Sequence, residues 1–324
     1  MPITVRMLSA SVLLRRRATP HRWKHIKPIS FLSFLPSLTM SNSEKFNIMK
    51  TTIIFAIACI VLMSSCSEKI DLTLNNAASK IVIEGSLTSE TKQHEVRVSR
   101  SLGYLDANAT PAVTDAQVTI SDGSQIFVLT HKGNGVYVTG PGVSGIPGRT
   151  YTIRVVADGQ EFTASERMNP VTPIDSLAVL KAYMAIQPGV VWEPGKQYYN
   201  IGVYCQEPGN ETNFYMFDVY VNNRLWTDTI TKRFFSDDGF INGSYIQGMN
   251  VLQIDAAPGD SVRLVMSSVS KDFYYFMYGV IQSGMSGNPF AGQPANLPSN
   301  LSNGALGYFR VSAVAEGVGI VPGQ

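Results

Sequence analysis

Turns containing glycine and asparagine recur roughly every 8–12 residues in the middle of the chain and divide it into short segments of alternating apolar and polar residues. The clearest turns are Asp122-Gly123, Gly133-Asn134-Gly135 and Asp158-Gly159. Such residues tolerate the positive φ angles that tight hairpins require. Because side chains alternate between the two faces of a strand, Val118 and Ile120 are expected on one buried face. Residues 80–172 are therefore predicted to form an antiparallel β-sandwich, immunoglobulin-like or transthyretin-like.

A second β-rich domain is predicted over residues 173–324. The segment MNPVTPIDSL places Pro170 and Pro173 among polar residues, and proline cannot donate to a sheet ladder. Strand-like segments such as QYYNIGVYCQ and NFYMFDVYVNNRLW follow it, and Asn222-Asn223 is the expected turn after the second of them. The fold class is therefore mainly β, with two antiparallel sandwich-like domains.

One segment of the second domain departs from strand periodicity. Apolar side chains recur every three or four residues near 271–283, which predicts a short amphipathic helix. Ser270 is the expected N-cap and Gly284 the expected stop. Core packing is the ordinary role of such a stripe, whereas the tyrosines beside it are candidates to face a ligand. They are Tyr274, Tyr275 and Tyr278.

The start of the chain carries the features of an export signal. Residues 1–48 are rich in Arg and Lys, and we expect them to be an upstream extension created by a misassigned start codon, since Met49 opens MKTTIIFAIACIVLMSSC. Residues 49–65 combine one lysine with an apolar core that is too short for the roughly 20 residues of a membrane-spanning helix, as in a secretory signal peptide. An alternative interpretation of residues 1–48 is a mitochondrial-type presequence, which would leave this internal signal unexplained.

Cys66 follows the apolar core directly, and this arrangement resembles the bacterial lipobox, in which the thiol becomes thioether-linked to diacylglycerol and the cysteine becomes the first residue. Acylated Cys66 would anchor the protein in the membrane, because two or three acyl chains give stable attachment. Residues 66–79 would then be a tether. The alternative is that Cys66 is an ordinary residue near an ordinary cleavage site.

The charge balance excludes a nucleic-acid partner. Nine of the 26 basic residues but only one of the 24 acidic residues precede Cys66, so the processed protein is acidic. Nucleic-acid binding needs a basic surface that neutralises phosphates, and after the signal no basic cluster exceeds Lys232-Arg233.

No sequence motif indicates catalysis. The chain has no serine-hydrolase, zinc-protease, dithiol or phosphate-loop signature. After processing only Cys205 remains beside the anchor, in a strand-like context that favours burial, and only His94 and His131 could serve as histidine bases. We therefore predict a protein that is not an enzyme and has no catalytic residues, no cofactor and no resident metal.

One polar loop is a candidate binding site. Asp237, Asp238 and Asn242 lie in DDGFING, whose oxygen atoms are of the kind that calcium prefers. The loop lacks the spacing of an EF-hand, and Asx-rich turns usually bind their own backbone, so calcium is the lesser interpretation. A hydrolase built on the paired carboxylates is also disfavoured, because adjacent residues do not flank a scissile bond.

Several segments together resemble a known family. IVIEGSLT, DAQVTISDG, FFSDDGFINGSYI, SVSKDFYYFMYGVIQS and PANLPSNLSNGALGYF look like domain-of-unknown-function family forty-two forty-nine, from about Ile81 to Val314. The resemblance implies an envelope lipoprotein of the Bacteroidota, often encoded beside a TonB-dependent receptor, with no assigned reaction or ligand.

These observations lead to a functional hypothesis. We expect a lipoprotein of the bacterial outer membrane, facing either the surface or the periplasm, that binds a glycan or peptide ligand or assists a TonB-dependent receptor. The alternative is a structural or adhesive envelope protein without a small ligand.

Overall fold

The computed structural model describes residues 47, 49–51, 53–55, 79–102, 109–184, 193–284 and 297–323. The chain divides into two compact units, residues 1–73 and residues 74–324. Within the first unit the described residues are helical, and no helix of the described residues is both long and apolar enough to span a bilayer. The signal segment 49–65 lies mostly outside the described residues, as do Cys66 and nearly all of the tether, so these assignments stay predictions.

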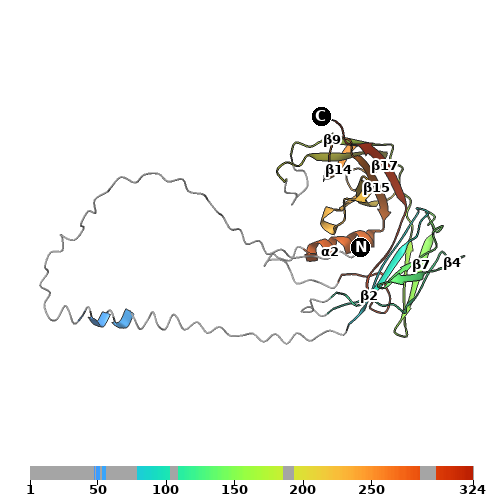
Figure 1. Ribbon diagram of the computed structural model, residues 1–324, viewed down its shortest axis with the longest axis horizontal. Coiled ribbons are helices and arrows are strands. Elements are labelled where there is room, and N and C mark those ends of the chain that lie inside the picture. The colour runs from blue at the N-terminus through green and yellow to red at the C-terminus, as the bar shows by residue number, and fades with distance from the viewer. Residues whose placement is uncertain are drawn as a thin grey trace. The chain divides into compact units, whose positions relative to one another are not determined.

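Two sheets share one hydrophobic core in the first part of the second unit (Figure 1). One sheet has the strand order β16-β1-β2-β6-β5 and the other the order β4-β3-β7-β8. The strands of the first are β1 (Ile81–Thr88), β2 (Glu95–Arg100), β5 (Thr130–Gly133), β6 (Val136–Val138) and β16 (Leu306–Ser312). Those of the second are β3 (Gln117–Ser121), β4 (Ile126–Val128), β7 (Thr150–Ala157) and β8 (Gln160–Arg167). The predicted antiparallel β architecture is confirmed here.

The hairpin turns lie where the sequence predicts them. Asn134 and Asp158 have φ angles of 49° and 54°, and glycine with positive φ follows each of them. A side chain normally disfavours this conformation, and Asn and Asp tolerate it best after glycine. Val118 and Ile120 both lie in the core shared by the two sheets, as their alternation predicts.

A strand from the C-terminal region completes the first sheet. β16 pairs in parallel with β1, in a register that places Gly85 opposite Phe309 and Ser86 opposite Arg310. Phe309 is fully buried in the same core as the strands of residues 80–172. A continuous division of the chain at residue 172 does not anticipate this exchange, because the pairing joins segments from opposite ends of the unit.

Two further sheets form the second core. Their orders are β14-β10-β9 and β12-β11-β15-β17, with β13 also paired to β11. The strands of the first are β9 (Ser176–Lys181), β10 (Tyr198–Gln206) and β14 (Tyr245–Asp255). Those of the second are β11 (Phe214–Val221), β12 (Arg224–Leu225), β13 (Phe234–Asp237), β15 (Ser261–Val269) and β17 (Val314–Ile320), and a short 3-10 helix η1 (Ile230–Lys232) precedes β13. Asn222 and Asn223 form the predicted turn, with φ angles of 49° and 61°.

The predicted helix is α2 (Lys271–Gly284). Ser270 caps it, because its Oγ accepts the backbone N–H of Phe273 at 3.2 Å. One face of α2 packs in a third apolar cluster with Met216 of β11 and Tyr308 of β16. The helix is therefore held by strands of both sandwiches.

We expect the β1–β16 pair to be sensitive to a methyl group at residue 307. A Cβ at Gly307 would collide with the carbonyl oxygen of Ile83, and the φ of +94° already strains any other residue. Gly307→Ala should lower the free energy of unfolding by about 3 kcal/mol or more, measured as a shift of the urea midpoint.

Gly304→Ala is the matched control, because Gly304 has a φ of +71° but no atom within 4 Å of the added methyl group. It should cost only about 1–2 kcal/mol, the price of the left-handed backbone. Equal losses for the two variants would show that the close approach of β1 and β16 does not limit stability.

Candidate functional site

The residues predicted in the polar loop do not converge on one ligand position. Asp237, at the end of β13, is exposed, and its Oδ1 accepts the backbone N–H of Gly239 at 3.0 Å. Asp238 is fully buried, and its Oδ2 accepts the backbone N–H of Asn213 at 2.9 Å. Asn242 donates through Nδ2 to the carbonyl oxygen of Glu211 at 3.2 Å. The loop thus uses its polar side chains mainly to bind its own backbone and that of the neighbouring loop.

The helix tyrosines separate into buried and exposed positions. Tyr274 is only 8% exposed and packs against the ring of Phe214, with centroids 5.1 Å apart. Tyr275 and Tyr278 are 55% and 47% exposed. Tyr274 therefore packs mainly in the apolar cluster under α2, and that these tyrosines face a ligand stays a prediction. Phe214, which pairs with Asp237, places this helix beside the polar loop.

A buried carboxylate was missed by the sequence reasoning. Glu207 is 2% exposed, and its Oε1 accepts the hydroxyl of Tyr215 at 2.7 Å. Burial raises the pKa of Glu207, and the negative charge of nearby Asp238 adds to this rise. The other carboxylate oxygen of Asp238, Oδ1, is buried without a hydrogen-bond partner among the described residues. No sequence pattern marks Glu207, since it directly follows a strand in an ordinary polar turn.

Burial also shifts the pKa of two further candidate residues, Cys205 and His94. Cys205 is 1% exposed, and burial raises the pKa of its thiol to about 11, which keeps it protonated at neutral pH. Burial lowers the pKa of His94, whose Nε2 lies 3.0 Å from the carbonyl oxygen of Val143. Within the described parts of the chain, no group of three or more His, Cys, Asp or Glu side chains could hold a metal ion.

A polar hollow lies between the adjoining sheets of the two sandwiches. It is a cleft of about 470 Å³, within the size range of small-molecule sites. Its walls come from β1 and β16 on one side, from β11 and β15 on the other, and from the connection between β1 and β2. The charged side chains among its lining residues are Glu90, Lys92, Glu95, Asp218, Arg233 and Arg310.

Strand alternation explains why these side chains face the cleft. On β16, Phe309 and Val311 enter the core of the first sandwich, so Arg310 between them projects to the opposite side. On β11, Phe217 and Val219 enter the second core, so Asp218 also projects outward. The sequence signal for this site is therefore a charged residue within a strand that is otherwise buried.

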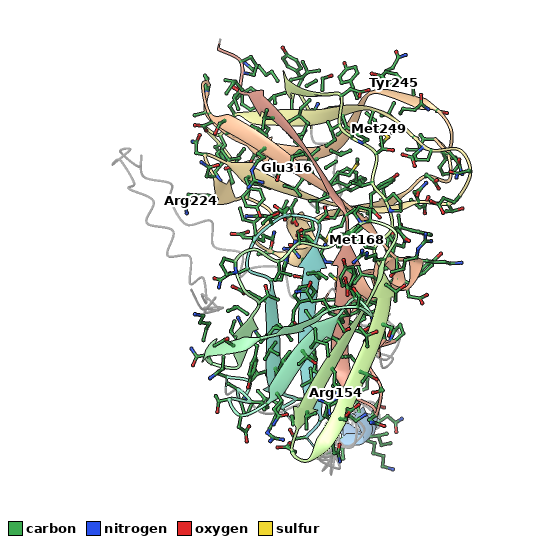
Figure 2. The ribbon with its side chains drawn as sticks, turned by 90° about the vertical axis from the view of Figure 1, so that its right-hand side faces the viewer. Arg154, Met168, Arg224, Tyr245, Met249 and Glu316 are labelled. Carbon is green, nitrogen blue, oxygen red and sulfur yellow. The ribbon has the colours of Figure 1, made fainter. Side chains whose placement is uncertain are left out.

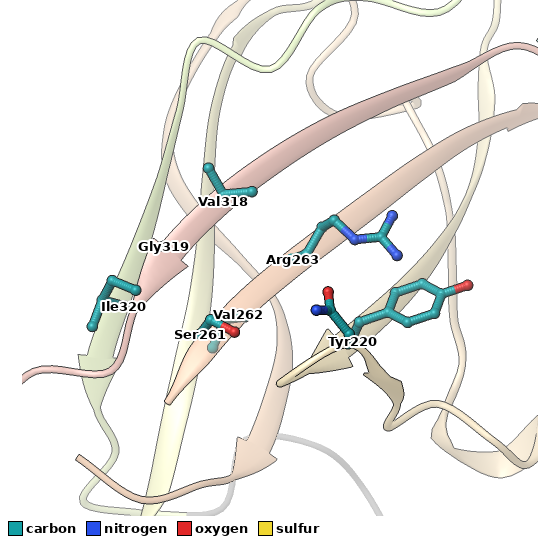
Figure 3. A pocket seen from close by; sticks show the side chains of 8 residues that line it. Tyr220, Ser261, Val262, Arg263, Val318, Gly319 and Ile320 are labelled. Carbon is teal, nitrogen blue, oxygen red and sulfur yellow. The ribbon is translucent and has the colours of Figure 1, made fainter. Parts of the chain in front are cut away.

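A shallower hollow continues on the same face of the second sandwich. It has a volume of about 270 Å³, and Figure 3 shows Val318 and Ile320 of β17 beside Arg263 of β15 and Tyr220 of β11. The guanidinium of Arg263 lies 4.1 Å from the centre of the Tyr220 ring. Tyr220 lines both, so it marks where this mainly apolar, shallower hollow meets the polar cleft.

The chain matches a known protein-family model. The family model described as Domain of unknown function (DUF4249) matches residues 67–317. No curated protein matches the chain. The matched range contains the residues that line the cleft and the buried carboxylates, and it ends just before Val318, Gly319 and Ile320 of the shallower hollow.

The raised pKa of Glu207 predicts a pH-dependent gain from Glu207→Gln. Because the folded state raises this pKa, the ionised side chain destabilises the fold above the raised value, and the penalty disappears as pH falls below the ordinary value of 4.5. The variant should be more stable than the wild-type protein at pH 8, with the difference shrinking toward pH 4 in urea titrations.

Glu211→Gln is the control, because Glu211 is exposed in the same region of the chain. It should follow the wild-type stability at every pH. A constant difference between Glu207→Gln and the wild-type protein across this range would contradict the assignment of the raised pKa to Glu207.

Proposed function

Since the chain belongs to the family Domain of unknown function (DUF4249), which assigns no reaction, we propose that it is a lipid-anchored outer-membrane protein that binds a ligand without transforming it. In this proposal it assists a TonB-dependent receptor, the partner that the sequence resemblance implies. The observation that carries the binding role is the charged cleft, which opens beside an apolar hollow on one face of the second sandwich.

The anchor rests on the order of segments at the start of the chain. The apolar segment ends at Ser64-Ser65, Cys66 follows, and the family match begins at residue 67. This order supports processing immediately before Cys66 and a folded part that starts after a short tether. Acylation of Cys66 would hold the protein at a bilayer by its lipid chains.

A binding role fits the cleft better than a catalytic role. Small-molecule sites are concave and combine apolar walls with polar groups that fix the ligand's orientation. On this face the shallower hollow supplies the apolar wall and the cleft supplies the polar groups. General bases and nucleophiles work best with a pKa near the working pH. The pKa of Cys205 lies far above neutrality, and both ring nitrogens of His94 are engaged, with Nδ1 accepting the Thr88 N–H at 3.4 Å.

The anchor and the partner can be tested together in the native host. A tagged protein translated from Met49 should carry a diacylglyceryl or triacylated Cys66 by intact-mass analysis, and should co-purify from detergent extracts with a receptor barrel. Cys66→Ala should leave the membrane fraction and lose both the lipid mass and the receptor.

Cys205→Ala is the matched control, since it removes the buried cysteine of the folded part and should remain anchored. An unacylated wild-type protein in the soluble fraction would overturn the lipoprotein assignment. Acylation without a receptor would instead favour a structural or adhesive role, and turnover of a glycan panel that Asp237→Ala abolishes would favour a hydrolase.

A further inference from the structure

Arg310 is a cation without an ionic partner inside the polar cleft. It belongs to β16, in the middle of the pairing with β1, and it is partly buried. No carboxylate of the described residues forms an ion pair with it, whereas the neighbouring cations of the cleft are paired. Lys92 pairs with Glu90, and the Nε of Arg233 lies 2.9 Å from Oδ1 of Asp218.

The cleft is lined by three basic and three acidic side chains, and Arg310 is the basic residue among them that forms no ion pair with a described residue. Among the negative groups, Asp218 and Glu90 have the strongest electrostatic interaction with Arg310. Each of them already forms an ion pair with another cation. Asp218 also accepts the hydroxyl of Thr227 at 2.9 Å. Glu95 lies on the lining too, but its side chain is exposed to solvent, where its charge is screened. The guanidinium of Arg310 is therefore available to pair with a negatively charged group of a ligand.

The guanidinium is held in place by neutral contacts. Its Nη1 donates to Oγ of Ser312 at 3.1 Å, and its Cζ lies 5.7 Å from the centre of the Phe273 ring at the start of α2. Burial lowers the pKa of Arg310 to about 10, so the group stays charged at neutral pH. These contacts orient a planar donor without neutralising it.

We propose that the cleft binds the carboxylate group of a small ligand, and that Arg310 receives this carboxylate. The inference rests on the proposed ligand-binding function and names its chemistry. A guanidinium presents parallel N–H groups that match the two oxygens of a carboxylate, which gives both strength and orientation. The volume of about 470 Å³ accommodates a sugar acid or the end of a short peptide.

The charge count favours a carboxylate over a phosphate. A carboxylate brings one negative charge, which matches the one positive charge of Arg310, the lining cation without an ion pair. A phosphate near neutral pH brings between one and two charges, and the second would face the carboxylates of Glu90 and Asp218 in a partly enclosed site. A neutral sugar or peptide would leave the guanidinium without its strongest partner.

The test is a calorimetric titration of the full mature lipoprotein in detergent, at fixed ionic strength. The probes are sodium acetate for the group alone, D-glucuronate with D-glucose as its neutral counterpart, and N-acetyl-tri-alanine with its C-terminal amide as its neutral counterpart. Inorganic phosphate is the competing anion. We expect glucuronate and N-acetyl-tri-alanine each to bind at least about tenfold more tightly than its neutral counterpart, and the tighter of the two will identify the source of the carboxylate.

Arg310→Gln should remove this advantage, while the unliganded variant should unfold at a temperature no lower than that of the wild-type protein, because an unpaired charge is lost. If Arg310→Gln does not fold, Arg310→Lys keeps the charge without the paired donors and should weaken binding about tenfold. Arg154→Gln is the matched control, since Arg154 pairs with Glu161 and is not among the residues that line the cleft. Figure 2 shows it at the end of the folded unit opposite Tyr245. It should bind as the wild-type protein does.

Three results would overturn this inference while leaving a ligand-binding function in place. They are equal affinity for the neutral counterparts, tighter binding of phosphate than of any carboxylate, and a carboxylate advantage that survives in Arg310→Gln. Absence of binding by every probe would also overturn it, and the receptor co-purification described above would then decide separately whether the proposed function stands.

Discussion

The parallel pairing of β1 with β16 is the constraint on which the rest of the folded unit depends. It brings a segment near the C-terminus into the sheet of the first sandwich, and the chain then passes directly through Ala313 into β17 of the second. The backbone N–H of Ser268 on β15 donates to the carbonyl oxygen of Ala313 at 3.0 Å, which ties the crossing to the second sandwich. The two cores are therefore linked by a hydrogen-bonded strand in addition to the connection near residue 172.

This shared strand also determines what lies between the cores. Because side chains alternate along a strand, the burial of Phe309 and Val311 in the first core turns Tyr308, Arg310 and Ser312 to the other side. Tyr308 joins the apolar cluster under α2, and Arg310 enters the cleft. The requirement to fill one core thus positions the polar groups of the neighbouring hollow.

The sequence predicts the features that arise from neighbouring residues. The turns at Asn134 and Asp158 and the cap at Ser270 depend on local backbone preferences, and all of them form as expected. The cleft depends on contacts such as Val314 N–H to Ser89 Oγ, which join residues 225 positions apart and leave no periodic signal. Glu207 likewise has no local sequence signal, since only the folded chain brings Tyr215 and Asp238 to it.

The unpaired charge of Arg310 is hard to explain by folding alone. Native domains are stable by only about 5–15 kcal/mol, and a partly buried charge without an ion pair reduces that margin. An apolar side chain at this position could pack against Phe273 without such a cost, and the pairing of β16 with β1 would not change. A guanidinium becomes favourable when a negatively charged group enters the cleft, because the cost of burial is then offset by paired hydrogen bonds. The fold alone therefore accounts for where Arg310 lies, whereas the proposed carboxylate ligand would account for its charge.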